Sequence, residues 1–219
     1  MSEDGWRAFL EAASLEDWAV LHGGAVTVYG CDSLADALRL ADAVARVPGF
    51  APSGAVLTLG NDRLSVRLTQ DMWALTPEHV ELARAVSAAA RAAGFAADRS
   101  RIQEVQIAIS AQPAEISLPF WRAVLGYRPA DEDNGNDPLA HSSVAWMQPL
   151  PEDKPLRHAM HIDVSVPKEF VEARVAAAVA AGGTIVADDE APEFWILADA
   201  AGNKVCVCAW PDGARAQGP

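Results

Sequence analysis

Apolar residues recur along residues 1–98 with two different periods, and the period distinguishes helices from strands. A helical period of about 3.6 residues predicts helices over residues 6–21, 34–47 and 77–93. Alternation of apolar and polar residues predicts strands over residues 25–29, 54–59 and 64–69, the last two joined by a three-residue turn. Thr76 and Pro77 are typical of a helix start and Gly94 of a helix end, which supports the third helix.

A second pattern, of a strand, a helix and three strands, occurs twice between residues 104 and 210. The first copy covers residues 104–110, 116–125, 127–130, 131–138 and 142–148, where the strand near 131–138 has the weakest signal. The second copy covers residues 158–166, 167–181, 184–187, 193–197 and 204–210. Such a tandem repeat indicates one domain made of two similar modules. The small and polar residues of 96–101 precede it, so we predict an α+β protein with domains over residues 1–98 and 102–212.

Composition narrows the classes of partner and the compartment. The chain has 30 acidic and 17 basic residues, and its net charge of −13 repels nucleic-acid phosphates and anionic lipids. No apolar run approaches the roughly 20 residues of a membrane span, and the N-terminus lacks the layout of a signal peptide. We therefore expect a cytoplasmic protein that binds neither nucleic acid nor membrane. The cysteines are expected to be free thiols, because Cys206 and Cys208 lie two apart on one predicted strand.

Three segments of the second half resemble the vicinal-oxygen-chelate superfamily, which includes glyoxalases and bleomycin-resistance proteins. They are a helix that ends in Leu-Gly, a His-x-Asp strand, and an Asp-x-x-Gly-Asn turn with the strand after it, over residues 118–127, 158–164 and 197–206. The resemblance implies two βαβββ modules that form a cup for a small molecule, and it implies a homodimer. In metal enzymes of the superfamily, four strands each supply one ligand to this cup. The corresponding positions are Gln106, Gln148 or a near neighbour, His161 and Cys206.

These four side chains form an unusual set of metal ligands. Zinc would accept His161 and a Cys206 thiolate, but two glutamine amides are weak ligands, and the superfamily's usual glutamate on the last strand is absent. We therefore expect no metal or other cofactor, and a divalent metal held by these four residues is the alternative. In the metal-free interpretation His161 is a hydrogen-bonded histidine and Cys206 is a small buried residue rather than a reactive thiol.

Alternation along residues 158–166 predicts which side chains line the cup. One face carries Ala159, His161, Asp163 and Ser165, and the face expected to meet the helices carries Met160, Ile162, Val164 and Val166. The same alternation groups Trp146 with Gln148, and Trp195 with Leu197. We predict a ligand-binding cup that mixes aromatic and polar groups and is lined by Gln106, Trp146, Gln148, His161, Trp195 and Cys206. Ordinary packing of the tryptophans is the alternative.

The first half resembles the pterin-4a-carbinolamine dehydratases. The resemblance rests on Trp18, the strand that ends at Tyr29, the helix 34–47 with Pro48 after it, and residues 68–76. That family uses histidine side chains as acid and base. The corresponding positions are Arg46-Val47-Pro48 and Thr69-Gln70, which contain no histidine, and we interpret His22 and His79 as surface residues. Dehydratase activity is therefore not expected, and this domain is expected to serve assembly or ligand capture.

The leading hypothesis is a glyoxalase-like protein that binds a small organic molecule in its second half. If the protein is an enzyme, the resemblance favours a lyase, isomerase or dioxygenase reaction, with His161 as general base and Asp163 orienting it. Two rival interpretations remain, a degenerate dehydratase (a hydro-lyase) and a non-catalytic protein that sequesters a drug or metabolite.

Overall fold

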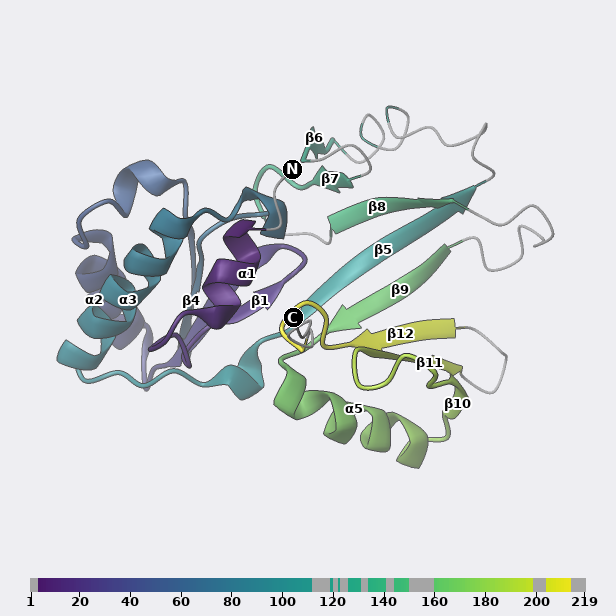
Figure 1. Ribbon diagram of the computed structural model, residues 1–219. Coiled ribbons are helices and arrows are strands. Elements are labelled where there is room, and N and C mark those ends of the chain that lie inside the picture. Colours follow the sequence, from purple (N-terminus) through teal and green to yellow (C-terminus); the bar gives the residue numbers. More distant parts are fainter. Residues whose placement is uncertain are drawn as a thin grey trace. The chain divides into compact units, whose positions relative to one another are not determined.

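The computed structural model divides the chain into two compact units, Met1–Ile102 and Gln103–Pro219. It describes residues 4–111, 119, 122, 126–130, 134–140, 144–149, 160–198 and 204–213 (Figure 1). Each unit has its own sheet, of four strands in the first and eight in the second. Among the described residues, no helix combines the length and apolar character that a membrane crossing requires.

The first unit packs three α-helices with a four-stranded antiparallel sheet in the order β1-β2-β4-β3. The helices are α1 (Asp4–Glu11), α2 (Leu34–Ala45) and α3 (Pro77–Ala92). The strands are β1 (Ala19–Leu21), β2 (Gly24–Gly30), β3 (Val56–Gly60) and β4 (Arg63–Arg67). Three short 3-10 helices complete the unit, η1 (Ala51–Ser53), η2 (Met72–Ala74) and η3 (Arg99–Arg101).

The start of the first unit differs from the sequence prediction. The helix predicted over residues 6–21 ends at Glu11, and Ala19–Leu21 forms the edge strand β1. Ser14 has a φ of 65°, a left-handed conformation that a right-handed helix excludes. The predicted three-residue turn is also one residue shorter, because Gly60 pairs with Arg63.

The second unit is built around an eight-stranded sheet in the order β10-β11-β12-β9-β5-β8-β7-β6. The first four strands of this unit are β5 (Glu104–Ala111), β6 (Arg128–Pro129), β7 (Asn134–Asn136) and β8 (Val144–Pro149). The next segment contains β9 (Met160–Ser165), α5 (Lys168–Ala180), β10 (Thr184–Ala187), β11 (Phe194–Ala198) and β12 (Lys204–Cys208). The helix predicted over residues 116–125 lies largely outside the described residues.

The two halves of this sheet repeat one arrangement. In each half the first strand pairs in parallel with the last, β5 with β8 and β9 with β12. The two halves meet where β5 and β9 pair antiparallel (Figure 1). The second half of the sheet contains the full predicted order of one strand, one helix and three strands. In the first half, the strand pairing is consistent with the same repeat.

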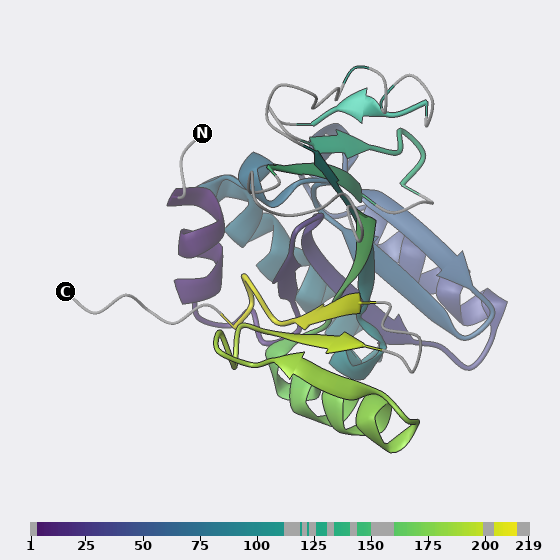
Figure 2. The same ribbon diagram turned by 90° about the vertical axis from the view of Figure 1, so that its right-hand side faces the viewer.

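Helix α5 covers one face of the second half of the sheet (Figure 2). Its Val171 and Val175 pack in one buried cluster with Val166, Leu197 and Val207 of the strand segments. Asp212 fixes the start of the helix, because its Oδ2 accepts a hydrogen bond from the backbone nitrogen of Lys168 at 3.1 Å.

The helix side of β9 is only partly covered. Val164 and Val166 contact the α5 cluster, as the alternation predicts. The same expectation is wrong for Met160 and Ile162, which are 54% and 49% exposed. The hydrophobic cluster beneath α5 packs against the end of β9 that carries Val164. Among the described residues, nothing in this cluster covers the other end of the strand.

Candidate functional site

Strand register defines three rows of side chains on the face of the second sheet opposite α5. Paired residues of neighbouring strands point to the same face, and so do residues two apart on one strand. The first row contains Phe194, Cys208, Ser165 and Glu104. The second contains Ile196, Cys206, Asp163 and Gln106. The third contains Ala198, Lys204, His161, Ala108 and Trp146. We call these three rows the polar face.

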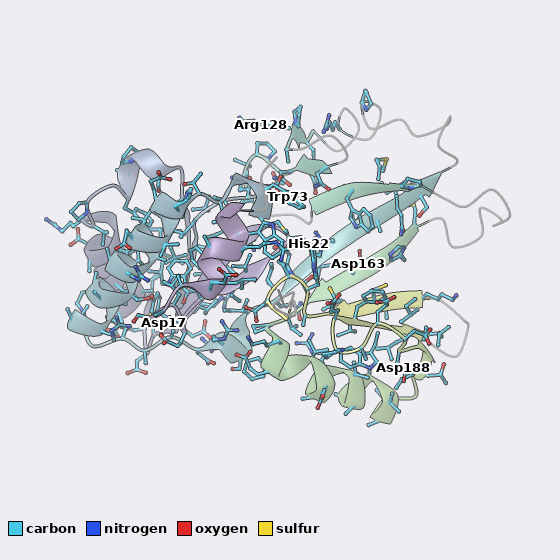
Figure 3. The ribbon with its side chains drawn as sticks, in the orientation of Figure 1. Asp17, His22, Trp73, Arg128, Asp163 and Asp188 are labelled. Atoms are coloured by element: carbon cyan, nitrogen blue, oxygen red, sulfur yellow. The ribbon has the colours of Figure 1, made fainter. Side chains whose placement is uncertain are left out.

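Asp163, labelled in Figure 3, lies on β9 in the second of the three rows of the polar face. Its Oδ1 lies 3.1 Å from Nε2 of His161, and its Oδ2 accepts a hydrogen bond from Nε1 of Trp146 at 3.0 Å. A carboxylate can only accept hydrogen bonds, so this geometry requires a hydrogen on Nε2 of His161. The ring nitrogen Nδ1 is then the one available to a ligand.

A small residue makes the contact between Trp146 and Asp163 possible. Trp146 is on β8 and Asp163 on β9, and β5 runs between these strands. Ala108 is the β5 residue level with both Trp146 and His161, and it is completely buried. Its methyl group lets the indole reach across β5, where a larger side chain would occupy the same space.

Both cysteines of β12 lie on the polar face as protonated thiols at neutral pH. Burial, reinforced by the charge of Asp163 and a hydrogen bond with it, raises the pKa of Cys206 to about 12. Burial also raises the pKa of Cys208 to about 11, and its Sγ lies 3.1 Å from Oγ of Ser165. Thiols with such pKa values are poor nucleophiles near pH 7.

Gln106 is the one residue of the polar face with a buried atom that lacks a hydrogen-bond partner among the described residues. It pairs with Asp163 across the β5–β9 contact, and it is 2% exposed. Its Oε1 has no hydrogen-bond donor in the part of the chain that the structure describes. Glu104, two residues earlier on β5, is buried as well. Sequence reasoning missed Glu104, although its spacing from Gln106 places it on the same face.

Most of the residues predicted to line the cup lie on this face. Gln106, Trp146, His161, Asp163 and Cys206 belong to the three rows, as given above. Gln148 lies one step further along β8, where its Oε1 accepts a hydrogen bond from Oγ of Ser110 at 3.3 Å.

Trp195 does not lie on the polar face. It pairs with Val207 of β12 and packs against the cluster beneath α5, so its predicted place in the cup is wrong. Ile196 takes that place because it pairs with Cys206. The prediction grouped the tryptophan with the correct neighbour, Leu197, but placed both on the wrong side, since β11 is half-buried on both faces and its sequence does not alternate.

Ligand atoms of His161, Asp163 and Cys206 lie within 4.8 Å of one another. Imidazole, carboxylate and thiolate are all zinc ligands, so the donor types and spacing fit a zinc ion better than a hard ion such as magnesium. This group contains His161 and Cys206 of the predicted ligand set and adds Asp163.

In the first unit, Arg46, which the resemblance in sequence aligns with a dehydratase histidine, and His79 have structural contacts. Arg46 forms an exposed ion pair with Asp42 at 2.9 Å. His79, interpreted from sequence as a surface residue, is partly buried, and its Nδ1 accepts a hydrogen bond from the backbone nitrogen of Thr76 at 3.0 Å. It completes a capping box at the start of α3. These contacts do not bring two imidazoles together.

The sequence of the second unit matches the model of a known protein family. Residues 106–208 match the family described as "Glyoxalase-like domain", a span that contains the predicted cup residues. This match supports membership of the glyoxalase-like superfamily for the second unit, with the α+β architecture described above. The match does not extend to the first unit. No curated protein matches the chain.

Proposed function

We propose that the second unit binds a small organic molecule on the polar face, without a metal ion. The observation that carries this proposal is the cluster around Asp163, in which His161, Trp146 and Cys206 reach one carboxylate from three other positions on the sheet. Small-molecule sites combine apolar and aromatic walls with a few convergent polar groups, and this face has both.

We propose a site without a metal ion because the polar groups of this cluster already form hydrogen bonds with one another. Each carboxylate oxygen of Asp163 already has a nitrogen donor, at 3.1 and 3.0 Å. The Cys206 side chain also forms a hydrogen bond with Asp163. A zinc ion would need the Cys206 proton removed and the His161 contact to Asp163 rearranged.

A second candidate function is catalysis with His161 as general base, and the 3.1 Å contact with Asp163 favours it. Asp163 would hold the ring with Nε2 as donor, so that Nδ1 takes a proton from the bound molecule. The carboxylate would then stabilise the imidazolium ion that forms. Lyase and isomerase reactions that begin with removal of a proton beside a carbonyl group suit such a base.

Two measurements on the full chain test the proposal. A chemically diverse library is screened by thermal shift against the wild-type protein. Each compound that stabilises the wild type is then tested against His161→Ala and against the control variant Trp195→Phe. We expect stabilisation that His161→Ala removes and Trp195→Phe keeps. The proposal fails if no compound stabilises the wild type, or if both variants respond like it.

Elemental mass spectrometry of the wild type and of His161→Ala tests the metal-free form. We expect no stoichiometric ion in either protein. An ion bound one-to-one in the wild type and lost in the variant would instead establish a metal centre at His161, Asp163 and Cys206. The same library would then be screened with the metal-loaded protein.

A further inference from the structure

The carboxylate of Asp163 bonds to groups of the protein itself. Its Oδ1 lies 3.1 Å from Nε2 of His161, and its Oδ2 accepts a hydrogen bond from Nε1 of Trp146 at 3.0 Å. The side chain of Cys206 forms a further hydrogen bond with this carboxylate. Asp163 is also only 6% exposed. A molecule on the polar face therefore meets the partners of Asp163 rather than the carboxylate.

His161 keeps one ring nitrogen free to accept a hydrogen bond. Nε2 carries the hydrogen in the contact with Asp163, so Nδ1 of the neutral ring has a lone pair and no hydrogen. Among the described residues, Asp163 is the polar partner of the ring, through Nε2. The His161 side chain is 18% exposed, and Nδ1 is not one of the fully buried unpaired atoms. Nδ1 is therefore an acceptor that a molecule in solution can reach.

The indole of Trp146 lies beside this acceptor. Trp146 and His161 bond to the two oxygens of one carboxylate, so their rings lie close together. Ala108 separates them on the sheet and contributes only a methyl group. Trp146 is half-buried, so part of it is accessible. An aromatic surface next to one polar atom is typical of a site for an apolar molecule with a single polar group.

We infer that the polar face selects molecules that present an O–H or N–H donor on a flat apolar body, and that this donor bonds to Nδ1 of His161. This inference rests on the binding function proposed above. A group that only accepts hydrogen bonds, such as an ether or carbonyl oxygen, would bring its lone pairs against the lone pair of Nδ1. Turning the ring does not relieve this conflict, because the bare nitrogen would then face the carboxylate of Asp163.

The position of the ring hydrogen is tested first, without a ligand. Long-range proton–nitrogen NMR spectra of the full chain, labelled with nitrogen-15 histidine and recorded at pH 8, distinguish a ring nitrogen that carries hydrogen from one that does not. The signals of His161 are those missing from His161→Ala. We expect hydrogen on Nε2 and a bare Nδ1. The opposite tautomer, or hydrogen on both nitrogens, would overturn the inference.

A matched pair of probes tests the selection. Phenol and anisole share the ring and the oxygen, but only phenol can donate a hydrogen bond. Both are titrated against chelator-treated full-length protein at pH 8, with ligand-observed NMR as the readout. We expect phenol to bind about five- to ten-fold more tightly, which corresponds to one hydrogen bond. Phenol should also shift the Nδ1 signal of His161 more than the Nε2 signal.

A variant identifies His161 as the acceptor. His161→Phe keeps a ring at this position and removes its nitrogens, so phenol and anisole should bind it about equally. Trp195→Phe, on the other face of the sheet, should keep the preference for phenol. If His161→Phe does not fold, the spectrum of the ring and the two probes on the wild type decide the question.

Equal or tighter binding of anisole to the wild type would overturn the inference, while the binding function would stand. If neither probe binds, each compound selected from the library is compared with its O- or N-methyl derivative. Loss of affinity on methylation supports the inference, whereas compounds without a donor, or with unchanged affinity, overturn it. A stoichiometric metal ion that is lost in His161→Ala would show that a metal occupies the position. If no library compound binds, the proposed function itself fails, and this inference fails with it.

Discussion

Trp146 on β8 donates a hydrogen bond to Asp163 on β9, 3.0 Å away, although β5 lies between the two strands. We predict that Trp146→Phe lowers the free energy of unfolding by about 1–3 kcal/mol, because it leaves a buried carboxylate oxygen without a donor. Urea denaturation measures this change. Trp195→Phe is the matched control, since Trp195 lies on the other face, and an equal loss in both variants would contradict the account.

Ala108 should tolerate no larger residue. Ala108→Leu places three extra carbon atoms where the Trp146 indole crosses β5, and overpacking of a buried site typically costs about 1–3 kcal/mol. The same substitution at Ala173, on the exposed side of α5, serves as the control. Wild-type stability of Ala108→Leu in urea would show that the indole does not need this space.

The thiols of β12 should resist modification. With pKa values of about 12 and 11, Cys206 and Cys208 are almost entirely protonated at pH 8, and only thiolates react rapidly with disulfide reagents. Two double variants each keep one thiol of β12, because Cys31→Ser is combined with either Cys206→Ser or Cys208→Ser. We expect the remaining thiol to be labelled slowly until the protein is unfolded. Fast labelling of the folded protein near pH 8 would mean that the thiol is exposed or that its pKa is low.

His79 should make stability depend on pH. Burial lowers its pKa below the usual histidine value of about 6.5, so the unfolded chain binds a proton more readily than the folded one. The contribution of His79 is therefore complete above about pH 6.5 and is lost as the pH falls from that value through the lower pKa of the folded state. Between pH 7.5 and 5.5, the wild type should lose more stability than His79→Gln. Parallel pH profiles for the two proteins would exclude this role.

Asp212 should stabilise α5 across a long stretch of chain. Its carboxylate accepts a hydrogen bond from the backbone nitrogen of Lys168, and loss of such a cap costs about 0.5–2 kcal/mol. Asp212→Ala should lower the free energy of unfolding by this amount, measured by urea denaturation. Asp189→Ala removes an exposed acid of the same unit and should have little effect.

The sequence predicts most elements of the second unit, because its strands and helix carry clear periodicity. Strand β10 occupies the predicted residues 184–187, and α5 differs from its prediction by one residue at each end. The helix prediction is wrong at Ala19–Leu21. These three apolar residues continue the helical spacing of the preceding segment, but they form a strand that pairs with β2. Tertiary pairing outweighs helix propensity there.

The candidate site could be predicted only in part. Alternation relates His161 to Asp163, since both lie on one strand, and the spacing from Gln106 also places Glu104 on the same face. The contact between Trp146 and Asp163 depends on the order of β8, β5 and β9, which no local pattern contains. Trp195 shows the opposite limit, because β11 is half-buried on both faces and its sequence gives no signal of which side chains lie on the polar face.

The most direct test of a metal-free ligand site on the polar face is calorimetric titration of the strongest library compound. The dissociation constant is measured for chelator-treated wild type, His161→Ala and Trp195→Phe. The account predicts that chelation changes nothing, that His161→Ala weakens binding at least about ten-fold by loss of a polar contact, and that Trp195→Phe binds like the wild type. Unchanged affinity in His161→Ala, or loss of binding on chelation, would contradict it.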